Sequence, residues 1–170
     1  MSKDCERERN MNMFPTVQNP RIADDNYIDT AERYEYQYPI IKRFLENKIN
    51  EWNIGDFLYE QGAQNIVLYA ITEFTEFVVD DLKRCERPIR ISAICDKNNQ
   101  KYMYGFQQHE VIGIDKLVAG YHAKKFDKIL ICSIFHVNKI FSDLMGRNIK
   151  QKDMISVSAA IFNGRGKSKC

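Results

Sequence analysis

The sequence lacks several features that would assign the protein to a particular class. It contains no run of about 18 apolar residues, so no transmembrane helix and no membrane insertion are expected. Its first residues are charged and lack the apolar stretch of a signal peptide, so we expect a cytoplasmic protein. The formal net charge is only +2, which excludes a strong electrostatic attraction to nucleic acid.

The five cysteines form no C-x-x-C pair, and their number is odd, as expected for reduced thiols. Cys95 and Cys132 lie in apolar runs, where a thiol serves as a small apolar side chain. His109 and His122 have no Cys or carboxylate neighbours at metal-ligand spacing, and we interpret them as surface histidines. We therefore predict no metal site.

The 170 residues are enough for one domain with a sizeable core. We divide them into an arm (1–38), a helical leader (39–62), a main domain (63–162) and a basic flexible tail (163–170). The arm is polar and irregular, so it is either disordered or docked on its domain or a partner through its tyrosines. These are Tyr27, Tyr34, Tyr36 and Tyr38.

In the leader, apolar residues recur at three- and four-residue steps and predict a helix with one apolar stripe. The stripe consists of Ile41, Phe44, Leu45, Ile49 and Trp52. We expect it to pack on the main domain, with Pro39 in the first turn of the helix. A second short helix is predicted at 54–61, between a cap at Asn53 and a left-handed Gly62.

After residue 62, short apolar runs alternate with helical stripes. The runs at 65–70, 89–95 and 128–133 are typical of strands buried on both faces. Shorter strands are predicted at 111–112 and 155–161, and residues 102–106 fit either a loop or a short strand. Helical stripes lie at 74–82, at 117–121 after a cap at Asp115, and at 137–145. This alternation predicts an α/β fold with a parallel sheet and right-handed crossovers.

Several segments follow a known order of elements. An amphipathic helix (40–52), a short helix ending near Gly62 and the strand NIVLYA (65–70) precede a strand ending at Asp96 and a strand DKILIC (127–132). The chain thereby resembles, over about residues 40–160, a family of small Rossmann-like nucleotide-binding domains of bacterial surface-polysaccharide gene clusters. That family is related to sugar-nucleotide epimerases and to the N-terminal domains of sugar acyltransferases. The resemblance implies a Rossmann-like parallel sheet flanked by helices, with an N-terminal helical leader.

The chain departs from the G-x-G-E-L-G turn of the family after the first strand. Ala70, Thr72 and Thr75 stand at the three glycine positions, which serve a tight turn, the close approach of pyrophosphate and close helix packing. We therefore expect a degenerate module that does not bind a dinucleotide in the usual pose. Thr72 or Thr75 could still offer a hydroxyl to a phosphate, or could simply cap the helix that follows.

Ligands of parallel sheets bind beyond the carboxyl ends of the strands, where the strand order reverses. Asp96 lies 21 residues after Thr75 (96 − 75), near the spacing of the acid that binds ribose, although a solvated turn explains it equally well. Ser133 and His136 either face a ligand or cap the next helix. The candidate binding residues are therefore Ala70, Thr72, Thr75, Asp96, Ser133 and His136.

Two functions remain open from the sequence. The first is binding of a nucleotide or nucleotide sugar in polysaccharide biosynthesis; the second is a non-catalytic structural or protein-interaction module that has lost this binding. The sequence identifies no cofactor and no catalytic constellation. Its expected partners are a nucleotide or nucleotide sugar, a further copy of the chain, or an enzyme of polysaccharide biosynthesis.

Overall fold

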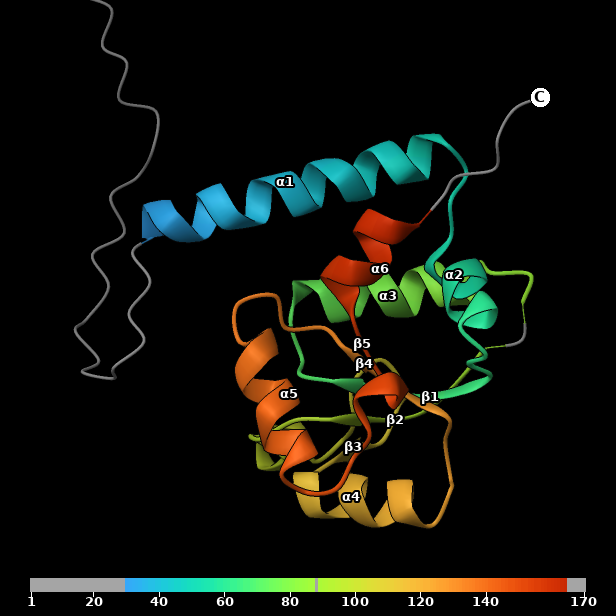
Figure 1. The fold of residues 1–170 in the computed structure, drawn as a ribbon, viewed down its shortest axis with the longest axis vertical. Helices are drawn as coiled ribbons and strands as arrows, with labels where there is room; N and C mark the ends of the chain where they lie inside the picture. Colours follow the sequence, from blue (N-terminus) through green and yellow to red (C-terminus); the bar gives the residue numbers. More distant parts are fainter. Residues whose placement is uncertain (1–29, 88, 165–170) are drawn as a thin grey trace, which may run out of the picture.

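A computed structural model describes residues 30–87 and 89–164 (Figure 1). Residues 1–29 of the predicted arm and residues 165–170 of the predicted tail lie outside this range. Five strands form one parallel sheet in the order β3-β2-β1-β4-β5. Their bounds are β1 Asn65–Tyr69, β2 Arg90–Cys95, β3 Val111–Ile112, β4 Lys128–Ile131 and β5 Met154–Ser156. The predicted α/β fold with a Rossmann-like parallel sheet is thus confirmed.

The strand order reverses beside β1. The chain runs from β1 outward through β2 to β3 and then returns to place β4 on the other side of β1. Val67 of β1 pairs with Ala93 of β2 and Ile129 of β4, and all three side chains are buried, as their apolar runs predict. The carboxyl ends of β1 and β4 therefore flank the crevice in which ligands of this topology bind.

Helices cover both faces of the sheet (Figure 1). One face packs against α4 (Ile114–His122) and α5 (Val137–Met145). The other packs against α2 (Ile54–Glu60), α3 (Glu73–Lys83) and α6 (Val157–Asn163), with α1 (Thr30–Ile49) lying outside α6. Two short 3₁₀ helices span Asn99–Tyr102 and Gln151–Asp153. Within the described ranges, no helix combines the length and the apolar character needed to cross a membrane.

The start of α1 differs from the prediction. The helix begins at Thr30 rather than at residue 39, so Pro39 lies inside it instead of in its first turn. Before Pro39, the ring of Tyr36 lies 5.7 Å from that of Phe135, and the guanidinium of Arg33 lies 5.0 Å from the same ring. These contacts attach the last part of the predicted arm to the domain, as the docked alternative expects.

The apolar stripe predicted for the leader is only partly buried. Trp52 is buried and meets Phe44 edge to face, with 6.5 Å between ring centroids. The prediction was wrong for the other three members, which are exposed: Ile41, Leu45 and Ile49. The buried face of α1 instead combines Ile40 and Phe44 with Asn47, whose amide donates to the carbonyl of Ile161 at 2.7 Å. A polar residue on the buried face is invisible to a search for apolar periodicity.

The structure decides between the two alternatives for residues 102–106 in favour of the loop, and it corrects one predicted strand, at 155–161. Residues 102–106 form no strand, because Gly105, Gln107 and Gln108 adopt positive φ angles of 83°, 46° and 69° and close a tight turn. The predicted strand 155–161 ends at Ser156, whose hydroxyl accepts the N–H of Ala159 and starts α6. The apolar residues after Ser156 follow a helical period and not a strand period.

The caps predicted for α2 are confirmed, whereas the N-cap predicted for α4 at Asp115 is wrong. Asn53 accepts the N–H of Gly55 at 2.7 Å, and Gly62 has a φ of 75°. Helix α4 starts at Ile114 with Gly113 as its N-cap, so Asp115 lies in the first turn. A carboxylate in a first turn interacts favourably with the helix dipole without being the cap.

Candidate functional site

A pocket of about 530 Å³ lies at the carboxyl ends of β1, β2 and β4, a volume within the range of small-ligand sites. Four of the six predicted site residues line it: Ala70, Asp96, Ser133 and His136. Tyr69, Lys97 and Lys139 also line the pocket, and sequence reasoning missed them. Thr72 and Thr75 are not among its lining residues. The rule that ligands bind where the strand order reverses therefore led to residues of this pocket, but it did not lead to all of them.

Ala70 occupies the position of the first glycine in a left-handed conformation, with φ of 73°. This conformation costs a residue with a Cβ about 1–2 kcal/mol. The N–H of Ala70 donates to the carbonyl of Cys95 at 2.8 Å, so β1 remains paired with β2 into the turn. The turn therefore keeps a backbone shape that suits glycine, at a strained residue in the pocket wall.

The two threonines close the turn between β1 and α3. Thr75 is completely buried; its hydroxyl donates to the carbonyl of Ala70 at 2.7 Å and accepts the N–H of Thr72 at 3.0 Å. The hydroxyl of Thr72, the N-cap of α3, donates to the carbonyl of Cys132 at 3.0 Å, beyond the end of β4. Both hydroxyls thus serve the start of the helix, which is the structural alternative raised by the sequence.

Asp96 completes the closure from the neighbouring strand. Its carboxylate accepts the N–H of Ile71 at 2.9 Å and the N–H of Asn98 at 2.7 Å. In a glycine-rich turn, backbone N–H groups of this kind bind pyrophosphate. Here the N–H groups of Ile71 and Thr72 are bonded to side chains of the protein itself. A phosphate in the usual pose would have to displace the carboxylate of Asp96.

The start of α5 offers a different position for an anion. Ser133 is buried, and its hydroxyl accepts the backbone N–H of His136 at 3.4 Å. The imidazole of His136, the N-cap of α5, makes no capping bond. Lys139 lies in the first turn and forms no ion pair within residues 30–87 and 89–164. The positive end of the helix dipole and the Lys139 ammonium therefore act together at this side of the pocket.

Tyr69, the last residue of β1, is one of the residues that line the pocket. Its side chain is only 2% exposed, and its hydroxyl has no hydrogen-bond partner in the described structure. Burial, reinforced by Cys95 and nearby carboxylates, raises the pKa of Tyr69 to about 12. The hydroxyl therefore stays protonated. No separate signal in the sequence points to this hydroxyl, because Tyr69 ends an apolar run that is typical of a buried strand.

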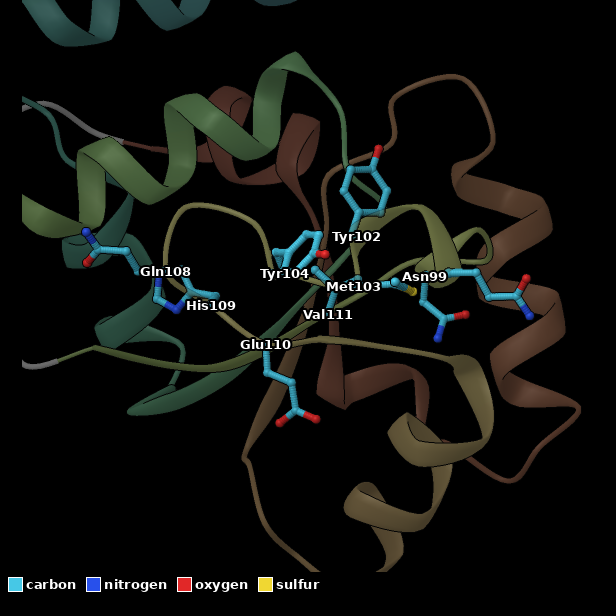
Figure 2. A pocket seen from close by; sticks show the side chains of 10 residues that line it. Asn99, Tyr102, Met103, Tyr104, Gln108, His109, Glu110 and Val111 are labelled. Atoms are coloured by element: carbon cyan, nitrogen blue, oxygen red, sulfur yellow. The ribbon is translucent and has the colours of Figure 1, made fainter.

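A second pocket, of about 620 Å³, lies over the loop between β2 and β3 (Figure 2). Figure 2 shows that its side chains diverge: Tyr102, Gln108 and Glu110 point in different directions. Two of its members, Met103 and Tyr104, are 77% and 99% exposed. Because its polar groups do not converge, this pocket is the weaker candidate.

The described residues provide no cluster of metal ligands, and their two buried thiols are neutral. No group of three His, Cys, Asp or Glu side chains that could hold a metal ion occurs among the described residues. Cys95 and Cys132 are buried, and burial raises the pKa of each to about 12, so both thiols are neutral and unreactive. A comparison with known protein families gives no match, and a comparison with curated proteins gives none either.

Proposed function

We propose that the protein is a binding module for a nucleotide or nucleotide sugar, held in the pocket at the carboxyl ends of β1, β2 and β4. The observation that carries the proposal is that Tyr69, which lines this pocket, has a buried hydroxyl without a hydrogen-bond partner among the described residues. Leaving a buried polar group without a partner costs about 1–3 kcal/mol, which a ligand oxygen accepting from Tyr69 would recover.

The charges around the pocket suggest how such a ligand lies. Its phosphate faces the start of α5, where Lys139 and the imidazole of His136 are exposed. Its sugar hydroxyls face Asp96, whose carboxylate oxygens each retain a free lone pair after accepting one N–H. A single phosphate-bearing group fits this arrangement better than a dinucleotide, because the turn after β1 is closed.

Binding is better supported than catalysis. The contact between Ser133 and His136 runs through the backbone N–H of His136, so the imidazole is not placed to activate the hydroxyl. The resemblance to domains of surface-polysaccharide gene clusters favours a nucleotide sugar as the ligand. The module would then retain a nucleotide sugar for an enzyme of polysaccharide biosynthesis.

Isothermal titration calorimetry with UDP-glucose, NAD and coenzyme A tests the proposal. We expect heat with UDP-glucose and weaker binding of NAD. Lys139→Ala should weaken UDP-glucose binding about tenfold, the equivalent of about 1.4 kcal/mol. Lys116→Ala is the matched control, because Lys116 is exposed on α4 and is not among the residues lining the pocket. Absence of heat with every nucleotide at millimolar concentration would contradict the proposal.

The second candidate is the structural or protein-interaction module. Two observations favour it: the closed turn after β1 and the exposed apolar residues of α1. It predicts that no nucleotide raises the melting temperature, whereas a ligand at about 100 times its Kd adds about 2.7 kcal/mol. A thermal-shift screen with the same three ligands therefore separates the two functions.

A further inference from the structure

Helix α1 carries a line of large apolar side chains that no described residue covers. Its members are 39% to 79% exposed: Tyr34, Tyr38, Ile41, Leu45 and Ile49. The first four are spaced by four, three and four residues, as in the apolar contact line of a coiled coil. We call these five residues the seam. An isolated exposed apolar residue is ordinary, but a contiguous line of five on one helix indicates an interaction surface.

The rest of α1 is fixed, so this seam cannot turn inward. Ile40 and Asn47 are buried against the domain, and the amide of Asn47 is bonded to the carbonyl of Ile161. The ammonium of Lys48 pairs with the buried carboxylate of Asp81. Figure 1 shows α1 on the outer side of α6, away from the sheet. The seam therefore faces outward while the opposite side of the helix holds it in place.

The charges beside the seam select the direction of a helix that pairs with it. Glu35 and Lys42 each follow a seam residue and flank it on one side, and neither forms an ion pair within the described ranges. In an antiparallel pair of α1 helices, Tyr34 would face Leu45 of the second copy, and Tyr38 would face its Ile41. In that register, Glu35 of each copy lies opposite Lys42 of the other copy, so the symmetric dimer contains two such pairs.

A parallel pair lacks this complementarity. It would place Gln37 of one copy beside Lys42 of the other and would leave Glu35 without a cation. The antiparallel register thus pairs both charges and buries the seam at once. A helix of 20 residues is about 30 Å long, long enough for the four seam layers between Tyr34 and Leu45.

We propose that α1 pairs antiparallel with α1 of a second copy and forms a symmetric homodimer. Sedimentation equilibrium of the full chain over a range of concentrations tests this. The expected mass of the associated species is twice 20.0 kDa. Leu45→Glu should give a monomer, because it places a charge in the apolar seam opposite Tyr34 of the second copy. Tyr104→Glu is the matched control and should leave the dimer intact, because Tyr104 is an exposed side chain far from α1 in the chain.

A charge exchange tests the partner and the register together. Glu35→Lys alone and Lys42→Glu alone should each weaken the dimer about tenfold, because each creates two like-charge pairs. The double variant Glu35→Lys/Lys42→Glu should restore the affinity of the unaltered chain. The proposal is overturned if the full chain is monomeric at every concentration. That result is expected if residues 1–29 or a different protein occupy the seam instead of a second copy. A double variant no tighter than the single ones overturns the antiparallel pairing.

Discussion

The carboxylate of Asp96 accepts the backbone N–H of Ile71, with 2.9 Å between Oδ2 and the nitrogen. The acid at the end of β2 thereby occupies the turn that follows β1. In a nucleotide-binding turn of this topology, an N–H at this place would meet pyrophosphate. A carboxylate of the protein thus occupies the position of a ligand's anion, which explains how the turn keeps its shape without any of its three glycines.

Asp96→Ala should lower the free energy of unfolding by about 2 kcal/mol, because the N–H groups of Ile71 and Asn98 both lose a charged acceptor. Urea denaturation followed by circular dichroism measures this. Asp80→Ala is the control: Asp80 is exposed and its pairing with Lys83 is worth little, so the loss should stay below about 0.5 kcal/mol. Equal stability of Asp96→Ala and the unaltered chain would favour a merely solvated turn.

Ala70→Gly should raise the free energy of unfolding by about 1 kcal/mol, because glycine adopts a φ of 73° without the Cβ clash. The same exchange at Ala119, an exposed residue inside α4, should lower the stability by about 0.5–1 kcal/mol. The two variants make the same exchange, at a left-handed residue in one case and at a helical residue in the other. Destabilisation by both would argue against a strained turn.

The architecture followed from the sequence because buried parallel strands leave continuous apolar runs, as in β1 and β4. The elements that were predicted wrongly depend on tertiary contacts or on single polar groups. Ser156 converts the end of an apparent strand into α6 through one hydrogen bond to Ala159. The start of α1 precedes a proline that favours a first turn, and its contact with Phe135 joins residues far apart in the chain.

The pocket was predictable only in part. Asp96 directly follows β2, Ser133 lies two residues after the end of β4, and His136 is the N-cap of α5. The topology rule therefore located all three. Tyr69 was not found, because a tyrosine in a buried run gives no sign of whether its hydroxyl has a partner. The roles of Thr72 and Thr75 depend on which carbonyls lie within reach, and a sequence does not contain those distances.

Acid should destabilise the protein through Asp153. Burial raises the pKa of this carboxyl, but the hydrogen bond from Tyr121 and the charge of Lys128 outweigh it and hold the pKa below its ordinary 3.8. The resulting stabilisation is present above the pKa of the unfolded chain, about 3.9, and is lost as the pH falls through the lower pKa of the folded state.

Urea midpoints measured between about pH 5 and about pH 2 should therefore fall less for Asp153→Asn than for the unaltered chain. Asp115→Asn is the matched control, because it makes the same exchange at a carboxyl that is 93% exposed in its pair with Arg147. Identical acid profiles of Asp153→Asn and the unaltered chain would contradict the assignment.

Tyr69→Phe should change stability and binding in opposite directions. Without ligand, removing the unpartnered hydroxyl should raise the free energy of unfolding by about 1 kcal/mol, because a buried donor no longer lacks an acceptor. Tyr121→Phe is the matched control: its hydroxyl contacts Asp153 at 2.7 Å and the N–H of Lys150 at 3.2 Å, so the same change should destabilise the protein. With UDP-glucose, Tyr69→Phe should bind about tenfold more weakly. Thermal denaturation and calorimetry measure both effects, and a more stable variant that binds with unchanged affinity would show that the ligand does not use Tyr69.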